Sequence, residues 1–235
     1  MSALTRWLDR RLYPTHDDNW DDEALRKQIL KYLRAGHVVL DLGAGAGIVR
    51  QMNFKGVAAR VYGIDPDPRI LENPNLDHAE VATAEAIPHA GDTFDMVFCD
   101  NVLEHLRDPD SVFREVARVL KPGGVFIVKT PNRAHYIALV ARVTPHGFHQ
   151  WYNRLRGRNS PDTFPTLYRA NTEQRVRTLA EKAGFSVTEL SFLDGRPEYL
   201  RISAAFYIVG WLYERLVTAH ISRLRPVLLV TFRKD

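Results

Sequence analysis

Residues 38 to 47 read VVLDLGAGAG, an apolar run that contains one aspartate and leads into three glycines at alternate positions. An apolar run bounded by glycines is typical of a fully buried strand in a parallel sheet. Gly43, Gly45 and Gly47 permit a sharp turn and let the backbone approach a ligand closely. A strand followed by an ordinary glycine-rich turn is the plainer interpretation, because a glycine pattern alone is a weak signal.

Asp41 favours the ligand-binding interpretation of this turn. A carboxylate at the buried carboxyl end of a strand costs free energy unless it is paired or binds something positive. A nucleotide-like ligand that carries an ammonium group would meet this need, whereas the pyrophosphate of a dinucleotide would be repelled. The stretch therefore predicts a site for a cationic nucleotide-like ligand.

A second acid follows at the end of the next expected strand, in RVYGIDPDP at residues 60–68. In sheets that bind adenosine cofactors, an acid at this strand end accepts hydrogen bonds from the ribose hydroxyls. Asp65 taken alone is equally compatible with a turn or helix-capping role. Beside the glycine turn, the ribose interpretation is favoured.

Four segments occur in order: VVLDLGAGAG, YGIDPDP, FDMVFCDNVLEHLRDP and LKPGGVFIVKTPN. Together they resemble the class I S-adenosylmethionine-dependent methyltransferases, and most closely the small-molecule branch that includes the ubiquinone-type O-methyltransferases. The resemblance covers roughly residues 25–132 and, more loosely, residues 180–187. It implies an α/β fold: a Rossmann-like, seven-stranded, mostly parallel sheet with helices on both faces. It also implies one domain over residues 1–235, with a substrate cap inserted at 133–169 after the fifth strand.

The resemblance implies that S-adenosyl-L-methionine is the cofactor and where it binds. The glycines would cradle its methionine end, Asp65 would hold the ribose, and Asp100 or Asn101 would face the methionine or the acceptor. Thr83 stands where family members often carry an aspartate, which leaves backbone groups to contact the adenine. The cofactor-binding residues are accordingly expected to be Asp41, Gly43, Gly45, Gly47, Asp65, Pro66, Ala84, Glu85, Asp100 and Asn101.

His105 is the expected catalytic base, because its ordinary pKa suits proton transfer near neutrality. A histidine that merely satisfies loop backbone is an equally open interpretation. Some relatives bind a divalent cation with a glutamate three residues before the Glu-His pair; here that position is Asn101, a weaker ligand, so no metal is expected. Candidate acceptor contacts are His135, Tyr136, His149, Trp151, Tyr152 and Tyr168.

The alternation of patterns places the other elements. Strands are expected near residues 38–42, 60–64, 79–83, 94–99, 125–130, 185–192 and 226–232, and helices over 21–34, 108–120, 172–183 and 199–217. In the second of these helices, Asp108 suits the N-cap and Pro109 the first turn.

Composition bounds the setting of the protein. With 235 residues and 45% hydrophobic content, the chain can bury an ordinary single core. One cysteine, Cys99, allows no disulfide within the chain and predicts a reducing, cytoplasmic location. The N-terminus lacks the apolar stretch of a signal peptide. The longest uncharged apolar run, residues 202–213, is too short to span a membrane.

Charge is unevenly distributed around a net value of +4. From Thr130 to Arg169 there are six arginines and a single acid, Asp162. This run is either a solvated face or a basic lid that attracts an anionic or lipid-linked acceptor. The apolar helix expected at 199–217 is compatible with core, with a homodimer face, or with peripheral contact to anionic lipid.

Of three rival functions, particular residues disfavour two. A nucleic-acid methyltransferase lacks support because the fourth-strand segment reads DNVLEH, without an Asn/Asp-Pro-Pro-aromatic pattern, so no nucleic-acid partner is expected. A nicotinamide dehydrogenase would carry Gly-x-Gly-x-x-Gly instead of glycines at alternate positions. A cofactor-binding scaffold without catalysis stays open. The function expected is methyl transfer to a small-molecule or lipid-linked acceptor, at oxygen.

Overall fold

The structure is a computed structural model that describes residues 3–16, 19–136 and 165–235. The chain forms two compact units, and each is described by itself. Unit 1 comprises residues 1–20, 131–165 and 192–227, and unit 2 comprises residues 21–130, 166–191 and 228–235. Neither this division nor any other observation tests the expected single domain with a cap at 133–169, which stays a prediction.

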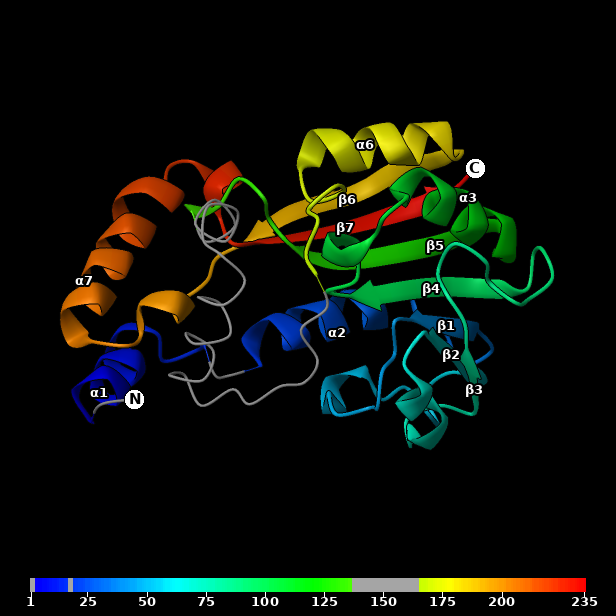
Figure 1. The fold of residues 1–235 in the computed structure, drawn as a ribbon, viewed down its shortest axis with the longest axis horizontal. Helices are drawn as coiled ribbons and strands as arrows, with labels where there is room; N and C mark the ends of the chain where they lie inside the picture. The colour runs from blue at the N-terminus through cyan, green and yellow to red at the C-terminus, as the bar shows by residue number, and fades with distance from the viewer. Residues whose placement is uncertain (1–2, 17–18, 137–164) are drawn as a thin grey trace. The chain divides into compact units, whose positions relative to one another are not determined.

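Within the described ranges, seven strands form one sheet in the order β3-β2-β1-β4-β5-β7-β6 (Figure 1). Strands β1 to β5 pair in parallel, with Asp41 of β1 aligned between Gly63 of β2 and Phe98 of β4. The strands are β1 (Val38–Leu42), β2 (Arg60–Asp65), β3 (His78–Val81), β4 (Phe94–Asp100), β5 (Leu120–Pro131), β6 (Phe185–Leu193) and β7 (Val227–Lys234).

Strand β7 is antiparallel to its neighbours β5 and β6. The amide of Asn132, just past the end of β5, donates to the carbonyl of Pro226, just before β7, at 2.7 Å. Likewise the amide of Asp235, after β7, donates to the carbonyl of Gly184, before β6, at 3.1 Å. The expected mostly parallel, seven-stranded α/β sheet is therefore confirmed, with a single reversed strand among those described.

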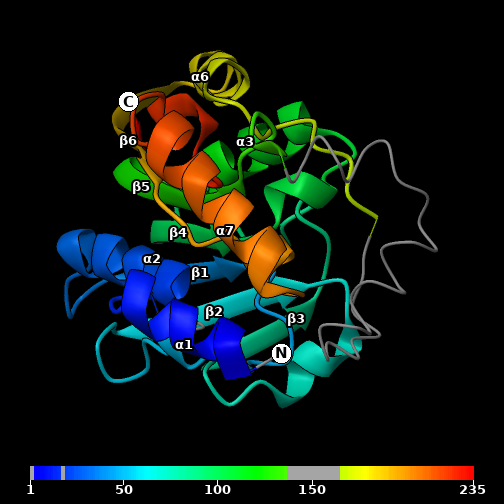
Figure 2. The same cartoon turned by 90° about the vertical axis from the view of Figure 1, so that its left-hand side faces the viewer.

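Helices cover both faces of the sheet, α2 on one side and α3 with α6 on the other (Figure 2). Asp108 caps α3 by accepting from the amide of Ser111 at 3.1 Å, and Thr172 caps α6 in the same way. Phe113 of α3 packs edge-on against Phe126 of β5 at 5.5 Å. The helices are α2 (Trp20–Tyr32), α3 (Pro109–Val119) and α6 (Glu173–Lys182), and the short 3-10 turns are η1 (Arg50–Met52), η2 (Pro68–Glu72) and η3 (Leu103–His105).

The expected elements differ from the observed ones mainly at their ends. Helix α3 stops at Val119, and β5 begins at Leu120, five residues before the expected start of that strand. The apolar segment at 199–217 is not one helix. It starts as a 3-10 turn, continues as α7 after the cap Ser203, and widens into a π-helical turn.

Among the described residues of unit 1, the longest elements are α1 and α7. Asp9 of α1 accepts hydrogen bonds from the hydroxyl of Tyr207 in α7 at 2.8 Å and from Arg201 at 2.6 Å. No helix among the described residues combines the length and the apolar character needed to cross a bilayer. The elements of this unit are α1 (Ala3–Leu12), η4 (Glu198–Leu200), α7 (Ala204–Tyr213), the π turn η5 (Glu214–Thr218) and η6 (Ser222–Leu224).

Candidate active site

The glycine turn after β1 is the first component of the site. Gly43, Gly45 and Gly47 all have positive φ, at 83°, 50° and 72°. A side chain at Gly43 would collide with Val102, and one at Gly47 would collide with Asn73. At Gly45 an added Cβ would meet only the carboxylate of Asp65, at 3.9 Å. The outer two glycines therefore serve the packing of the protein itself, whereas the middle one borders open space that a ligand can use.

Two asparagines that the sequence did not single out hold this turn. The side-chain amide of Asn73 donates to the carbonyls of Ala44 and Gly45, both at 3.0 Å. The side-chain amide of Asn75 donates to the carbonyl of Gly47 at 3.1 Å. Both asparagines are buried. The turn is thus fixed by side chains from beyond β2, in a segment whose sequence resembles an ordinary loop.

Asp65 makes the local turn that its sequence context allowed, and it also contacts the glycine turn. One carboxylate oxygen accepts from the amide of Gly45 at 2.9 Å, and the other accepts from the amide of Asp67 at 2.8 Å. The second bond is the local turn, and the first fixes Asp65 against the glycine turn. A carboxylate has about four lone-pair positions, so acceptor capacity is left for ligand hydroxyls.

Asp41 is a buried acid without a cation beside it. It is 6% exposed, and among the described residues no lysine, arginine or histidine forms an ion pair with it. Burial raises the pKa of its carboxyl well above the ordinary value, and the negative charges of Asp100 and Asp65 raise it further. A positively charged ligand would relieve this cost. The requirement predicted from sequence is therefore present in the structure.

Asp100, at the end of β4, does have a cation. The ammonium group of Lys129 on β5 lies 2.9 Å from its carboxylate and 2.8 Å from that of Asp21 in the first turn of α2, and it also pairs with Asp22. Burial raises the pKa of Asp100 to about 7, Lys129 opposes that rise, and Asp22 adds to it. Three acids around one cation leave this edge of the sheet rich in negative charge.

Sequence analysis singled out neither Lys129 nor its acidic partners Asp21 and Asp22. The signal was nevertheless available, because Lys129 interrupts the apolar run VFIVKTP in the same way that Asp41 interrupts VVLDLG. Lys129 is fully buried. A charge inside a buried strand requires a partner, and the sequence does not say where that partner lies.

The residue after β4, Asn101, adopts a left-handed backbone with φ of 53°. Its amide donates to the carbonyl of Lys129 at 2.9 Å. The next residue, Val102, fills the space that a side chain at Gly43 would occupy. A non-glycine residue in this conformation marks a place where the surroundings constrain the backbone. The contact of Val102 with Gly43 connects the glycine turn to the segment that carries His105.

Glu104 and His105 form the titratable centre of this segment. Glu104 is 4% exposed and accepts a hydrogen bond from the hydroxyl of Thr130 at 3.1 Å, and Asn171 donates to that hydroxyl at 2.6 Å. Burial raises the pKa of Glu104 to about 7, although hydrogen bonding to Thr130 opposes the rise. The nearest ring nitrogen of the half-exposed His105 lies 3.9 Å from its carboxylate. Neither Glu104 nor this network was singled out from the sequence.

Tyr168 lies against the same centre. It has a left-handed backbone with φ of 50°, and its amide lies 3.1 Å from the carbonyl of Glu104. The amide of Leu167 donates to the same carbonyl at 2.6 Å. Of the candidate acceptor contacts, Tyr168 is therefore placed beside His105 by backbone hydrogen bonds.

The segment after β3 carries the residues expected near the adenine. The amide of Ala82 donates to the carbonyl of Asp65 at 3.1 Å, and a turn closed from Ala86 to Thr83 holds Ala84 and Glu85 half-buried. Pro66 is exposed directly after β2. Since β1, β2, β3 and β4 are parallel, these residues lie at the same edge of the sheet as Asp41 and Asp100.

The remaining candidate acceptor contacts are not brought to this centre by any described contact. His135 is 2% exposed within unit 1, where its ring nitrogen lies 3.4 Å from the carboxylate of Glu214 and its ring centre 4.3 Å from that of Tyr136. These contacts are those of packed side chains. His149, Trp151 and Tyr152 lie outside the described residues.

Comparison with known proteins agrees with this geometry. A family model described as "Methyltransferase domain" matches residues 40–128. The ubiquinone biosynthesis O-methyltransferase of Pseudomonas putida (strain W619) is 34% identical over 176 residues, covering 64% of this chain and 72% of that protein. The corresponding protein of Albidiferax ferrireducens is 31% identical over 173 residues, covering 64% and 67%. The crystal structure of an S-adenosylmethionine-dependent methyltransferase from Mesorhizobium loti superimposes with a TM-score of 0.57 at 19% identity, covering 92% of this chain and 97% of that one.

The reversed seventh strand, the glycine turn and the acids at the carboxyl edge define a Rossmann-like nucleotide-binding fold. The chain belongs to the class I S-adenosylmethionine-dependent methyltransferases. It is an enzyme whose cofactor is S-adenosylmethionine. The open space at Gly45 and the buried carboxyl of Asp41, whose pKa is raised in the absence of a ligand, fit a cofactor with a cationic methionine end.

Proposed function

We propose that this enzyme methylates a hydroxyl group on a small-molecule acceptor, with His105 as the base. The observation that carries the proposal is the pair formed by half-exposed His105 and buried Glu104 at the carboxyl edge of the sheet. A hydroxyl acceptor must lose a proton, and an imidazole beside a carboxyl group is suited to take it. The names of the two bacterial relatives, both O-methyltransferases, support oxygen as the acceptor atom.

The cofactor supplies a methyl group on a sulfonium, which is already a good leaving group. The chain's own residues would bind and orient it. Asp41 and Asp100 would offset positive charge at the methionine end of the cofactor, and the turn at Gly45 would leave room for that end. Asp65 would accept hydrogen bonds from the ribose hydroxyls. Backbone groups at Ala84 and Glu85 would face the adenine.

Glu104 would act through His105 rather than on the acceptor. Its carboxyl is held by Thr130, and its backbone carbonyl by Leu167 and Tyr168. With a pKa of about 7, its carboxyl is ionised above neutrality and then places a negative charge beside the imidazole. Tyr168 would border the acceptor, which we expect to be anionic or lipid-linked given the arginines between residues 130 and 169.

The test is an assay of S-adenosylhomocysteine release with catechols and hydroxybenzoates, alongside matched aromatic amines and a single-stranded RNA. Methylation of the hydroxyl compounds is expected, and the product is identified by NMR of a ¹³C-labelled methyl group. Labelling at nitrogen only, or of the RNA only, would contradict the proposal.

The role of His105 is tested by His105→Gln, with His78→Gln, an exposed histidine at the start of β3, as the matched control. Loss of general-base catalysis typically costs about 10²–10⁴-fold, so kcat should fall by at least ~100-fold for the first variant only. Cofactor affinity, measured by calorimetry, should be unchanged in both. An unchanged kcat in His105→Gln would leave the histidine as a loop residue.

A further inference from the structure

Helix α7 is apolar on the side that faces away from the protein. Its inner side is buried and consists of Tyr207 and Gly210, followed by Glu214 and Thr218 of the π turn. Its outer side carries Phe206, Val209 and Leu212 and continues to Leu216 of the π turn, with Val209 59% and Leu216 66% exposed. Surface helices of globular proteins normally place polar side chains outward, and residues 202–213 contain no charge at all.

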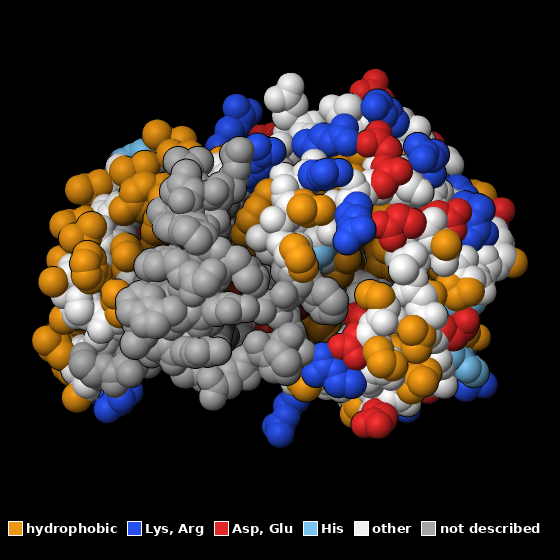
Figure 3. Space-filling view, in the orientation of Figure 1, with side chains coloured by type: hydrophobic (Ala, Val, Ile, Leu, Met, Phe, Trp, Pro, Cys, Tyr) orange, Lys and Arg blue, Asp and Glu red, His pale blue; other side chains and the backbone are white. Residues whose placement is uncertain are grey.

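Helix α1 extends this surface within unit 1. Leu4 and Trp7 are each more than half exposed, at 55% and 53%. The helix is fixed to α7 by the buried contact of Asp9 with Tyr207. Figure 3 shows hydrophobic side chains gathered over both helices. We call this surface the apolar face and define it by its six members: Leu4, Trp7, Phe206, Val209, Leu212 and Leu216. Contiguous exposed apolar surface of this kind marks an interaction site.

The charges on these two elements are sorted by sign. Their acids point inward, since Asp9 is paired with Arg201 and Glu214 is buried beside His135 and Thr218. Their outer charges are all arginines, and they contain no exposed acid. The exposed arginines are Arg6, Arg10 and Arg11 on α1 and Arg215 on the π turn after α7.

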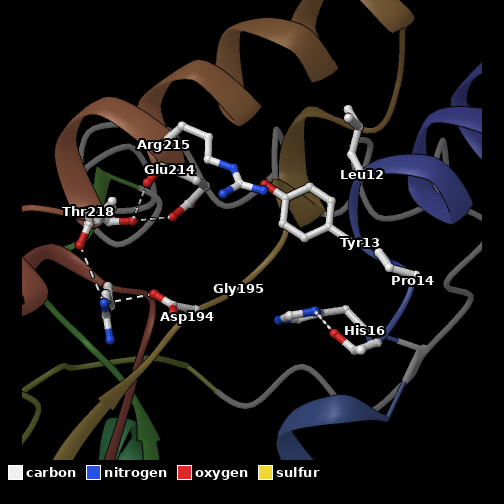
Figure 4. A pocket seen from close by; sticks show the side chains of 12 residues that line it. Leu12, Tyr13, Pro14, His16, Asp194, Gly195, Glu214, Arg215 and Thr218 are labelled. Carbon is white, nitrogen blue, oxygen red and sulfur yellow. Dashed lines mark hydrogen bonds and ion pairs between the residues drawn. The ribbon is translucent and has the colours of Figure 1, made fainter.

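Arg215, one of these arginines, lines a pocket. A pocket of about 380 Å³ within unit 1 is lined by Tyr13, His16, Arg215 and Arg225, among others. Arg225 is paired with Asp194 at 2.7 Å, and Arg215 reaches toward Tyr13 (Figure 4). Among the described residues no carboxylate forms an ion pair with Arg215, Arg10 or Arg11. Positive charge without an internal partner therefore lies next to the apolar face.

We propose that the apolar face docks on an anionic membrane surface, with α7 lying in the boundary between headgroups and acyl chains. Apolar side chains flanked by arginines, with a tryptophan among them, are the combination that interfacial helices use. Anionic headgroups attract each nearby arginine. A second copy of the chain fits less well, because a two-fold contact between identical faces would bring arginines of the same sign together.

The test is co-sedimentation of the full-length protein with vesicles of phosphatidylcholine alone or with 30% phosphatidylglycerol. Binding to the anionic vesicles is expected, with weaker binding in 0.5 M NaCl and little binding to phosphatidylcholine alone. The substitution Val209→Asp should weaken binding at least ~10-fold, because it places a charge in the acyl boundary. Leu71→Asp, at a position 62% exposed in unit 2, is the matched control and should bind like the unmodified protein.

A second pair of variants tests the charge. Arg10→Glu with Arg11→Glu should weaken binding by at least ~10-fold, since each arginine near an anionic surface contributes measurably. Arg60→Glu with Arg114→Glu makes the same charge change on exposed arginines of unit 2 and should have a small effect. Circular dichroism verifies that the variants are folded.

Three results would overturn the proposal. The first is absence of binding to anionic vesicles by the unmodified protein, which would mean that something else covers the face. The second is equal binding by Val209→Asp and Leu71→Asp. The third is a dimer in light scattering that Val209→Asp converts to a monomer, which would assign the face to a second copy. None of these measurements depends on methyl transfer.

Discussion

The two units treat charge in opposite ways. In unit 2 the excess is negative and internal: Lys129 is surrounded by Asp21, Asp22 and Asp100, and no cation among the described residues pairs with buried Asp41. In unit 1 the internal charges are balanced, since Asp9 pairs with Arg201, and the excess is positive and external. Uncompensated charge costs free energy where it is buried and little where it is solvated. The unbalanced acids of unit 2 therefore indicate a ligand site, and the outer arginines of unit 1 indicate a surface.

The largest expected effect comes from removing the one cation at the centre of the acid cluster. Lys129→Met should lower the free energy of unfolding by about 3–5 kcal/mol, because three carboxylates lose their partner in a buried site. Urea denaturation measures the change. Lys121→Met, which breaks a more exposed pair with Asp95 at 2.8 Å, should cost less than about 1 kcal/mol. Equal losses would mean that burial of the cluster is energetically unimportant.

Breaking the ion pair of Asp9 with Arg201 in unit 1 should lower the free energy of unfolding by a smaller amount. Asp9→Ala removes hydrogen bonds to Arg201 and to the Tyr207 hydroxyl, which together should cost about 2–3 kcal/mol. Hydrogen exchange should show faster opening of α1 and α7 while the sheet stays protected. Arg177→Ala, which breaks an exposed pair four residues apart on α6, should change stability by less than about 0.5 kcal/mol. Exchange that accelerates uniformly would show that the units do not open separately.

Cofactor affinity should depend on the acid beside the glycine turn. Asp65→Ala removes the acceptor of the Gly45 amide together with the acceptor expected for the ribose, so binding of S-adenosylhomocysteine should weaken by at least ~10-fold in calorimetry. Asp67→Asn keeps the amide that donates to Asp65 and serves as the control. If affinity were the same in both variants, Asp65 would be only a turn residue.

The smallest effect is a pH dependence. Burial raises the pKa of Glu104 from 4.5 to about 7, so the folded protein holds this proton more tightly than the unfolded chain. Its contribution to stability is fully present below about pH 4.5 and is lost as the pH rises through about 7. The unmodified protein should therefore lose roughly 1–3 kcal/mol of unfolding free energy relative to Glu104→Gln as the pH rises over that range.

Glu115 supplies the opposite case for the same experiment. Its hydrogen bond from Arg118 lowers the pKa of its carboxyl. The unfolding free energy of the unmodified protein, relative to that of Glu115→Gln, should be constant above about pH 5. It should fall only as the pH drops below the ordinary pKa range of a glutamate. Parallel pH profiles for the two variants would contradict the assigned shifts.

Sequence patterns alone predict the order of strands and helices along the chain, the glycine turn and the acids at strand ends. These follow from local patterns, because burial on both faces imposes continuous apolar runs, positive φ selects glycine, and capping selects aspartate and threonine. The requirement of Asp41 for a positive partner could be read in the same way.

Which distant residues meet depends on the packing of the folded chain. Two of the three partners of Lys129 lie more than a hundred positions earlier, in the first turn of α2, and Asn171 reaches Glu104 through Thr130. The exposure of the outer apolar side chains of α7 likewise could not be predicted, because an uninterrupted apolar sequence is compatible with a buried helix and with an exposed one. Burial and pairing depend on the packing of elements far apart in the chain, so residue types and their spacing state that a charge needs a partner without saying which residue supplies it.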